Sequence, residues 1–517
     1  MKSVPDLTGR YHARAPMGPR SLASVAVVVV VLGTSTAVTT TRRAASTDVS
    51  ACGTARASAT DVDVASFDDV SIATTVFRPQ RTCARRPAPA VIATHGWGGS
   101  RWTPDVLGAD TDAGRHLAAL LDDGYSVVSV DLRGHGASGG TSTFHEPTVE
   151  LRDVSAVIDM VASLDWVASD GASDPTVAIL GASYGGALAL LVAAFDARVD
   201  AIVPMVTWNE LERSLAPNGV VNSRGVGALA TSPTVRTAKP LGSALTDAVA
   251  SRELSATLVR TFERANPGRW IDQIDVPTFL VQGFRDRLFP VNEALETLTA
   301  LRDRDVDVWL VAAQIGHVEP DALPTLDGIL PRDCALWTGR RAITTFLDAT
   351  LRADAEAVAH MRIMPPITFA TEQGRCVTTG TWPPHEQVRL AVGGELVGRT
   401  ALFTATERTT LVGVPRFEGT LAAGAEAHMA LVHDHGPLSL VLGGGGTDVR
   451  ADDEGSIAAD LYAFATTLEP GDILWLDTTG CDCVPEGTLE IGVLPSSYGP
   501  FSIGTPTSEP HSVHDPS

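Results

Sequence analysis

The alternation of strand-like and helix-like segments constrains this chain more than any other feature. From about residue 62 to 347, short runs of β-branched and apolar residues alternate with helical patterns, which predicts parallel strands joined by crossover helices. Because each run is apolar along nearly its whole length, we expect helices on both faces of a mostly parallel sheet. The expected strands are 70–77, 90–96, 126–132, 176–181, 200–206, 277–283 and 307–313.

The connections between these strands differ in length and pattern. One is a clear helix, because six apolar residues recur at helical spacing and place one apolar stripe against the sheet. They are Leu151, Val154, Val157, Ile158, Val161 and Leu164. Residues 209–272 form the one long gap, with weak patterning and several Gly and Pro. We interpret 209–272 as an inserted cap.

The C-terminal part of the chain has a different sequence pattern. After an expected helix around 337–350, short strands are separated by Gly, Pro and Asp turns, a pattern typical of a β-sandwich or jelly roll. We therefore predict an α/β domain over 60–350 and a jelly-roll domain over 355–500. Residues 502–517 are polar and contain proline, so we expect a loose tail.

Length and charge exclude several classes of protein. A chain of 517 residues is too long for one ordinary globular core. Its 39 basic and 61 acidic residues give 39 − 61 = −22, so its surface should repel nucleic acid and anionic lipid headgroups. A hydrophobic share of 44% with 19% charged residues is enough for packed cores and argues against general disorder.

The N-terminus has the pattern of an export signal. Residues 22–38 are apolar and follow Arg10, Arg14 and Arg20, as in a secretory signal peptide. The solid apolar core is shorter than the roughly 20 residues needed to span a bilayer, and a tilted signal anchor is the alternative. We predict that 1–45 is a signal peptide or anchor. The protein is then secreted or associated with the cell envelope, touching a membrane only through this segment if it is uncleaved.

The cysteines fit an exported protein. All of them lie beyond the apolar segment: Cys52, Cys83, Cys334, Cys376, Cys481 and Cys483. An even number in an exported chain favours disulfides. Cys52 with Cys83 is the easiest pair to envisage, and a second bond is expected from Cys376 to Cys481 or Cys483. Cys52 also ends a run resembling a bacterial lipoprotein cleavage box, and lipidation there is the less favoured alternative.

One serine sits where a catalytic nucleophile is expected. The run 181–185, Gly-Ala-Ser-Tyr-Gly, lies between an expected strand and a helical segment. A nucleophile elbow needs a serine on such a strained turn, with small neighbours and a helix N-terminus behind it. The same pattern recurs at 136–140, but that copy starts four residues after its strand and no helix follows. Ser183 is therefore predicted as the nucleophile, and Ser138 as an ordinary loop residue.

A serine hydroxyl needs a base and an acid that orients the base. In α/β-hydrolases these follow in the order Asp or Glu, then His, on loops after later strands. Asp286 follows the strand 277–283, and His317 follows the strand 307–313. We predict Asp286 as the acid and His317 as the base. Glu210 is the alternative acid.

The tetrahedral oxyanion should be held by backbone N–H groups. Tyr184 supplies one such N–H by geometry, and Trp97, in the His-Gly-Trp-Gly-Gly loop at 95–99, is expected to supply the second. Trp208 and Trp97 are candidate aromatics of the substrate pocket.

The remaining histidines suggest no metal site. His116 is expected on a surface helix. His433 and His435 are expected in a solvated loop, so no metal is assigned, and the predicted chemistry needs no cofactor.

Several motifs together resemble the X-prolyl dipeptidyl peptidase and cocaine esterase family of serine hydrolases. The motifs are HGWGG at 95–99, DLRGHGASGG at 131–140, GASYGG at 181–186, QGFRDRLFP at 282–290 and GH at 316–317. The resemblance implies an α/β-hydrolase fold with a C-terminal jelly roll. The segment 461–477 is similar to the late strands of that jelly roll. Typical members place a Pro-Tyr pair in the first oxyanion loop and use the tyrosine hydroxyl as a donor. This chain has His95-Gly96-Trp97 there, which favours a backbone donor.

These patterns predict an exported serine hydrolase that works through an acyl-enzyme. Its substrates would be small esters, amides or X-Pro peptides entering between the cap and the jelly roll. Two alternatives remain at this stage. One is a carboxylesterase without dipeptidyl-peptidase activity, and the other is a catalytically silent, wall-associated protein that binds glycans through its jelly roll.

Overall fold

The structure is a computed structural model that describes residues 57–317, 340–393 and 398–494, apart from positions 81, 84, 85, 110, 111 and 482. The predicted export signal at 1–45, Cys52 and the predicted tail at 502–517 lie outside the described residues. Within the described part of the chain, no helix is both long enough and apolar enough to cross a membrane.

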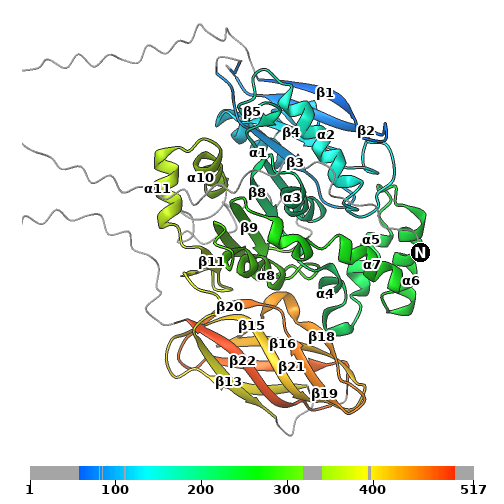
Figure 1. The fold of residues 1–517 in the computed structure, drawn as a ribbon. Coiled ribbons are helices and arrows are strands. Elements are labelled where there is room, and N and C mark those ends of the chain that lie inside the picture. The colour runs from blue at the N-terminus through cyan, green and yellow to red at the C-terminus, as the bar shows by residue number, and fades with distance from the viewer. Residues whose placement is uncertain are drawn as a thin grey trace, which may run out of the picture.

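A ten-stranded sheet forms the first domain (Figure 1). Its strand order is β1-β2-β4-β3-β7-β8-β9-β10-β11-β12. The strands are β1 (Ser58–Ala65), β2 (Ser71–Arg78), β3 (Ala90–Thr94), β4 (Ser126–Val130), β7 (Val177–Ala182), β8 (Val199–Met205), β9 (Thr278–Gly283), β10 (Val308–Ala313), β11 (Ile367–Ala370) and β12 (Cys376–Thr379). Pairing is parallel from β4 to β11. Each run predicted as a strand overlaps one of these strands, with bounds that differ by at most two residues.

Both ends of the sheet depart from the predicted parallel pattern. The segment 70–77 forms β2, which pairs antiparallel with β1 and with β4. The chain enters through a β1–β2 hairpin, whose turn is closed by the Val70 carbonyl accepting from the Ser66 N–H at 2.9 Å. A short turn can join only antiparallel strands, because consecutive parallel strands need a long crossover connection. At the other end, β12 pairs antiparallel with β11.

Helices cover both faces of the sheet. One core cluster combines the sheet with helices α2, α3 and α8, and a second combines the opposite face with α1 and α10. Their bounds are α1 (Asp112–Asp122), α2 (Glu150–Ala162), α3 (Tyr184–Phe195), α8 (Val291–Arg302) and α10 (Arg340–Leu351), and α11 (Ala355–Ile363) follows α10. The predicted mostly parallel α/β fold with helices on both faces is thereby confirmed.

The region predicted as a cap, 209–272, is helical and lies between β8 and β9. Figure 1 shows its helices α5, α6 and α7 grouped at one side of the sheet. The bounds are α4 (Leu211–Leu215), η2 (Pro217–Gly219), α5 (Ser223–Ala230), α6 (Lys239–Ser251), α7 (Ala256–Arg264) and η3 (Pro267–Gln273). On α7, Leu258 and Phe262 lie four residues apart and are both buried. This spacing gives the short helix an apolar face.

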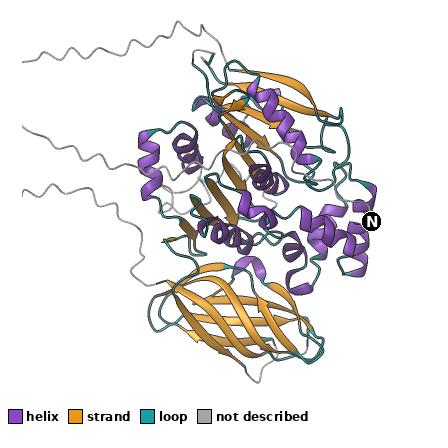
Figure 2. Ribbon diagram, in the orientation of Figure 1, coloured by secondary structure: helices purple, strands orange, loops and turns teal. Residues whose placement is uncertain are grey.

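The second domain is a β-sandwich of two five-stranded sheets (Figure 2). The first contains β13 (Glu386–Val392), β22 (Glu486–Leu494), β15 (Thr409–Thr420), β19 (Ser456–Asp460) and β20 (Phe464–Leu468). The second contains β14 (Arg399–Thr404), β21 (Ile473–Thr479), β16 (Glu426–His435), β17 (Leu438–Val441) and β18 (Thr447–Arg450). Alternate residues from both sheets fill the core between them, among them Phe417, Leu431, Leu476 and Leu489.

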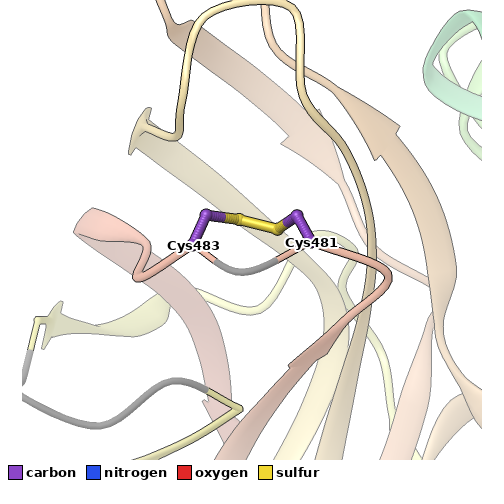
Figure 3. The surroundings of a disulfide bond; sticks show 2 residues. All are labelled: Cys481 and Cys483. Atoms are coloured by element: carbon purple, nitrogen blue, oxygen red, sulfur yellow. A yellow bond between two sulfur atoms is a disulfide. The ribbon is translucent and has the colours of Figure 1, made fainter.

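A disulfide joins Cys481 to Cys483 in the connection between β21 and β22 (Figure 3). The expectation that Cys376 pairs with one of these two residues is therefore wrong. The two cysteines are close enough to bond each other, because their Cα atoms are 5.2 Å apart. Cys83 and Cys376 are disulfide-bonded as well. The pair Cys52–Cys83 stays a prediction, since Cys52 is outside the described residues.

Candidate active site

Ser183 occupies a strained turn between β7 and α3. Its backbone has φ 55° and ψ −119°, a conformation that side-chain-bearing residues rarely adopt and that marks functional turns. The Ser183 N–H donates to the carbonyl of Met205 at 2.8 Å, and the hydroxyl of Thr207 donates to the Ser183 carbonyl at 2.8 Å. The elbow is thus fixed to the neighbouring strand β8.

The glycines around Ser183 are required by close backbone contacts. A Cβ added to Gly185 would lie 2.7 Å from the Thr94 carbonyl oxygen and 2.8 Å from that of His95. A Cβ added to Gly181 would overlap the Gly185 carbonyl oxygen and the Thr94 hydroxyl. Glycine therefore lets α3 approach β3 closely enough to form the turn.

Three side chains that are distant in sequence meet at this elbow. Ser183 Oγ lies 3.0 Å from Nε2 of His317, where it can donate its proton. On the other side of the ring, Nδ1 of His317 lies 2.8 Å from Oδ2 of Asp286. The three residues follow β7, β10 and β9, whose carboxyl ends lie at one edge of the sheet. This is the arrangement that a nucleophile, a base and an orienting acid require.

Asp286 is held in place by its own turn. Its side chain is 0% exposed, and its Oδ1 accepts hydrogen bonds from the N–H groups of Leu288 and Phe289, both at 2.9 Å. Oδ2 is left to face His317. The edge of the Phe289 ring contacts the His317 ring, with centroids 5.0 Å apart. One turn therefore orients the carboxylate and packs against the base.

Of the two residues predicted to bind the oxyanion, Tyr184 follows Ser183 directly, and Trp97 lies in a loop that approaches Ser183 at Gly96. Gly96 approaches it closely, because a Cβ added there would lie 3.8 Å from Ser183 Oγ. Within the described residues, the N–H groups of Trp97 and Tyr184 have no hydrogen-bond acceptor. The indole N–H of Trp97 instead donates to the Leu229 carbonyl on α5 at 3.1 Å. Any donation from Trp97 to substrate must therefore come from its backbone.

The alternative residues lie elsewhere. Ser138 is buried in a turn, where its hydroxyl donates to the Asp131 carbonyl at 2.5 Å and accepts from the Ala73 N–H at 2.8 Å. Glu210, the alternative acid, has a side chain that is 53% exposed and faces Arg213 at 3.8 Å. Neither residue contacts the Ser183–His317 pair.

Trp208 does not line an open pocket, so that prediction is corrected. The residue is 1% exposed, and its indole N–H donates to the Ala265 carbonyl at 3.1 Å. Its ring packs against Phe144 and Phe289. Sequence position placed Trp208 just after a strand, but its side chain is buried and contacts Phe289, whose ring packs against His317.

Two predictions about histidines are also corrected. His116 lies on α1 but is 1% exposed, so it is a core residue. His433 and His435 lie on strand β16, not in a loop, and His433 is 0% exposed. The strand continues to His435 because its last residues pair with β17.

His433, His435 and Asp472 are the one group of possible metal ligands found among the described residues. Nε2 of His433 and Nδ1 of His435 each lie 2.8 Å from the Asp472 carboxylate. The amide Nε2 of Gln373 donates to Nδ1 of His433 at 3.0 Å, so the ring hydrogen sits on Nε2 and points at Asp472. This arrangement is a hydrogen-bond network, and we assign no metal to it.

A buried polar layer behind the elbow was not recognised from sequence. Nε2 of His145 donates to the Tyr184 carbonyl at 2.7 Å, and the two rings stack with centroids 3.7 Å apart. The Tyr184 hydroxyl lies 2.8 Å from Ser142 Oγ. Burial lowers the pKa of His145 to about 3, so this imidazole stays neutral. The layer fixes the residue that follows the nucleophile.

Glu150 belongs to the same layer and should make stability depend on pH. Burial raises the pKa of its carboxyl to about 7, although Thr143 donates to it through N–H and hydroxyl. Between pH 4.5 and 7 the folded state then holds one proton more than the unfolded state. Stability therefore falls as pH rises through this window, by about 3 kcal/mol at most.

We expect Glu150→Gln to remove this dependence, because the amide stays neutral and can still bond Thr143. Thermal unfolding of both proteins at pH 5 and pH 8 checks it. The unfolding temperature of the variant, relative to that of the wild type, should be higher at pH 8 than at pH 5. An equal difference between the two proteins at both pH values would contradict the assignment.

Comparisons with solved structures place the fold. An aminopeptidase from a Thaumarchaeota archaeon has a TM-score of 0.64 and 13% identity, over 85% of this chain and 97% of that protein. An α-amino acid ester hydrolase has a TM-score of 0.65 and 12% identity, over 94% and 98%. A CocE/NonD family hydrolase from Staphylococcus aureus has a TM-score of 0.58 and 14% identity, over 86% and 95%. The shared architecture is an α/β-hydrolase domain followed by a β-rich domain.

Sequence comparisons find similarity to named serine esterases and to one peptidase family. Proteins of Mycobacterium bovis and Mycobacterium tuberculosis named as serine esterases are 28% identical over 165 residues. The match spans 30% of this chain and a quarter of each relative. Residues 68–319 match the family model described as X-Pro dipeptidyl-peptidase (S15 family).

The fold and the family match together indicate a serine-type hydrolase. The match of residues 68–319, just under half of the chain, to the X-Pro dipeptidyl-peptidase (S15 family) model agrees with the resemblance to the X-prolyl dipeptidyl peptidase and cocaine esterase family. The resemblance predicted from the motifs is confirmed.

Proposed function

We propose that Ser183, His317 and Asp286 are the catalytic triad of this hydrolase and that it works through an acyl-enzyme. The observation that carries the proposal is the continuous relay of 3.0 Å from Ser183 Oγ to His317 and 2.8 Å from His317 to Asp286. Such a relay lets a serine hydroxyl act as a nucleophile at neutral pH.

In the first half-reaction, Ser183 Oγ attacks the substrate carbonyl carbon while its proton moves to Nε2 of His317. The N–H groups of Tyr184 and Trp97 hold the oxyanion that forms. The intermediate collapses when His317 gives that proton to the departing alcohol or amine. The bond to the leaving group breaks, and the acyl group stays on Ser183.

In the second half-reaction, water replaces the leaving group. His317 takes a proton from water, and the resulting hydroxide attacks the acyl carbon. Collapse of this intermediate returns the proton to Ser183 Oγ and releases the carboxylic acid. Asp286 keeps the hydrogen of His317 on Nδ1 throughout, so Nε2 is free to accept in both halves.

Small esters are the proposed first substrates, with short X-Pro peptides as the second class. Two similar proteins support these two classes: one is named as a serine esterase and the other as an aminopeptidase. An alcohol is a better leaving group than an amine, so one triad should cleave the ester faster. Parallel assays of nitrophenyl esters and X-Pro anilides will rank the two classes.

Export of the protein is proposed with the same function. It is supported by the apolar segment 22–38 with its preceding arginines and by the half-cystines of the described residues. N-terminal sequencing of protein recovered from the culture medium and cell envelope tests this point. A mature chain that begins at Met1 or Met17 and stays in the cytosol would contradict it.

A fluorophosphonate probe tests the nucleophile directly. We expect the wild type to be labelled and Ser183→Ala to lose both labelling and hydrolysis of short nitrophenyl esters. Ser138→Ala is the matched control, because Ser138 stands in the same Gly-Ala-Ser-x-Gly pattern but its hydroxyl is hydrogen-bonded to the backbone of Asp131 and Ala73 and not to a histidine. Labelling that survives in Ser183→Ala would exclude the proposed nucleophile.

A further inference from the structure

A glycine-rich turn of the jelly roll packs against the turn that carries Asp286. Gly443–Gly446 connects β17 to β18, and its four residues have φ values of 57°, 72°, 113° and 89°. A Cβ added to Gly444 would lie 2.9 Å from the Phe284 carbonyl oxygen and 3.2 Å from the Cα of Arg285. The two backbones touch at a distance that glycine alone permits.

Arg287 closes the same contact from the other side. Its Nε donates a hydrogen bond to the Gly444 carbonyl, and a Cβ on Gly445 would overlap its guanidinium group. The Arg287 carbonyl accepts a hydrogen bond from the side chain of Asn222, at the start of α5, at 3.0 Å. The jelly roll and the inserted helices thus both hold the residue next to Asp286.

The glycine turn is anchored within the sandwich. Nε2 of His428 on β16 lies 2.6 Å from the Gly445 carbonyl oxygen, and Nδ1 of the same ring lies 2.8 Å from Asp448. A Cβ added to Gly443 would lie 2.8 Å from the Tyr462 carbonyl oxygen. The β-sandwich therefore fixes the position of Gly443–Gly446, and through that turn it fixes the position of the 284–287 turn.

That turn determines where the Asp286 carboxylate points. The two N–H groups that hold Oδ1 come from Leu288 and Phe289, which follow Arg287 directly. A shift of Arg287 would move both donors, and the carboxylate would turn away from His317. Reacting groups tolerate little displacement, since about 1 Å can cost about 100-fold in rate.

We propose that Gly443–Gly446 is a positioning element for catalysis, through which the jelly roll holds Asp286 against His317. Gly444 and Arg287 are its positioning residues, since neither contacts the reacting atoms. The inference rests on the proposed triad and goes beyond it, because it makes the second domain part of the catalytic apparatus.

The first test is Gly444→Ala in the full-length protein. Its added Cβ meets backbone, so the 284–287 turn must move, and we expect kcat to fall by about 10 to 100-fold with KM nearly unchanged. Gly436→Ala is the matched control. Gly436 lies in the same domain at φ 56°, and its added Cβ would meet no atom within 4 Å. It carries the same backbone penalty and should keep full kcat.

A second variant approaches the contact from the hydrolase side. Arg287→Met removes the donor to Gly444 while leaving the glycine turn unchanged, so it keeps the test valid if Gly444→Ala fails to fold. We expect the same fall in kcat. Full kcat in folded Gly444→Ala or in Arg287→Met would overturn the inference.

A double-mutant cycle separates positioning from general damage. If Gly444 and Arg287 act through Asp286, then neither Gly444→Ala nor Arg287→Met should lower kcat further in an Asp286→Asn background. Additive losses would mean a merely structural role and would overturn the inference. If Asp286→Asn alone kept full activity, the proposed triad would fail instead, so the two failures can be told apart.

Discussion

Replacing Asp286 by Asn should lower kcat by about 10⁴-fold while the protein stays folded. The structure gives a specific reason. Oδ1 accepts from the N–H groups of Leu288 and Phe289, so the amide oxygen of Asn must take that side. The NH2 group then faces Nδ1 of His317, which has to accept instead of donate. The ring hydrogen moves to Nε2, where it blocks proton transfer from Ser183.

Steady-state kinetics on a nitrophenyl ester, with thermal unfolding to check the fold, measures this effect. Glu210→Gln is the matched control, because Glu210 was the alternative acid in the sequence and its side chain is 53% exposed, facing Arg213. It should retain wild-type kcat. The assignment of the acid would be reversed if Glu210→Gln were the inactive variant and Asp286→Asn the active one.

Much of the site could be predicted because parallel strands share an edge. Ser183, Asp286 and His317 each follow a strand, and the carboxyl ends of β7, β9 and β10 lie together. The adjoining strand and the following helix separated Ser183 from Ser138, which lies in the same glycine pattern. The α/β class was equally accessible, since buried parallel strands are apolar throughout.

The failed predictions share another cause, because they depend on where side chains point and on contacts distant in sequence. β1 was missed since its residues are mostly exposed at the sheet edge and give no apolar run. Trp208 looked available for substrate until its ring proved buried. No sequence pattern indicated a role for Glu150, whose carboxyl accepts hydrogen bonds from the loop at Thr143. The bond between Cys481 and Cys483 could be assigned only once the connection between β21 and β22 was known.

The role of the glycine turn of the jelly roll also depends on contacts that are distant in sequence. A run of four glycines at 443–446 is obvious in the sequence, and by itself it predicts only a loop. Its contact with Phe284 and Arg285 crosses about 160 residues of chain, as the bond from Arg287 to Gly444 does at a separation of 157. Only the docking of two domains gives the run a role.

Replacing Gly181 by Ala should disrupt the elbow itself. The new methyl group would overlap the Gly185 carbonyl oxygen and the Thr94 hydroxyl, and the carbonyl belongs to the helix backbone, which cannot rotate away as a side chain can. We expect the free energy of unfolding to fall by about 1–3 kcal/mol, as is typical of overpacked sites. Because α3 and β3 would be pushed apart at Ser183, labelling by the fluorophosphonate probe should disappear as well.

Gly242→Ala is the control that isolates sterics from the loss of a glycine. Gly242 lies within α6, and its added Cβ would reach only the Thr237 side chain, at 4.0 Å. Alanine favours helix over glycine by about 0.5–1 kcal/mol, so this variant should unfold at a slightly higher temperature and keep full labelling. If Gly181→Ala melted and reacted like Gly242→Ala, the close approach of α3 to β3 would not be what forms the elbow.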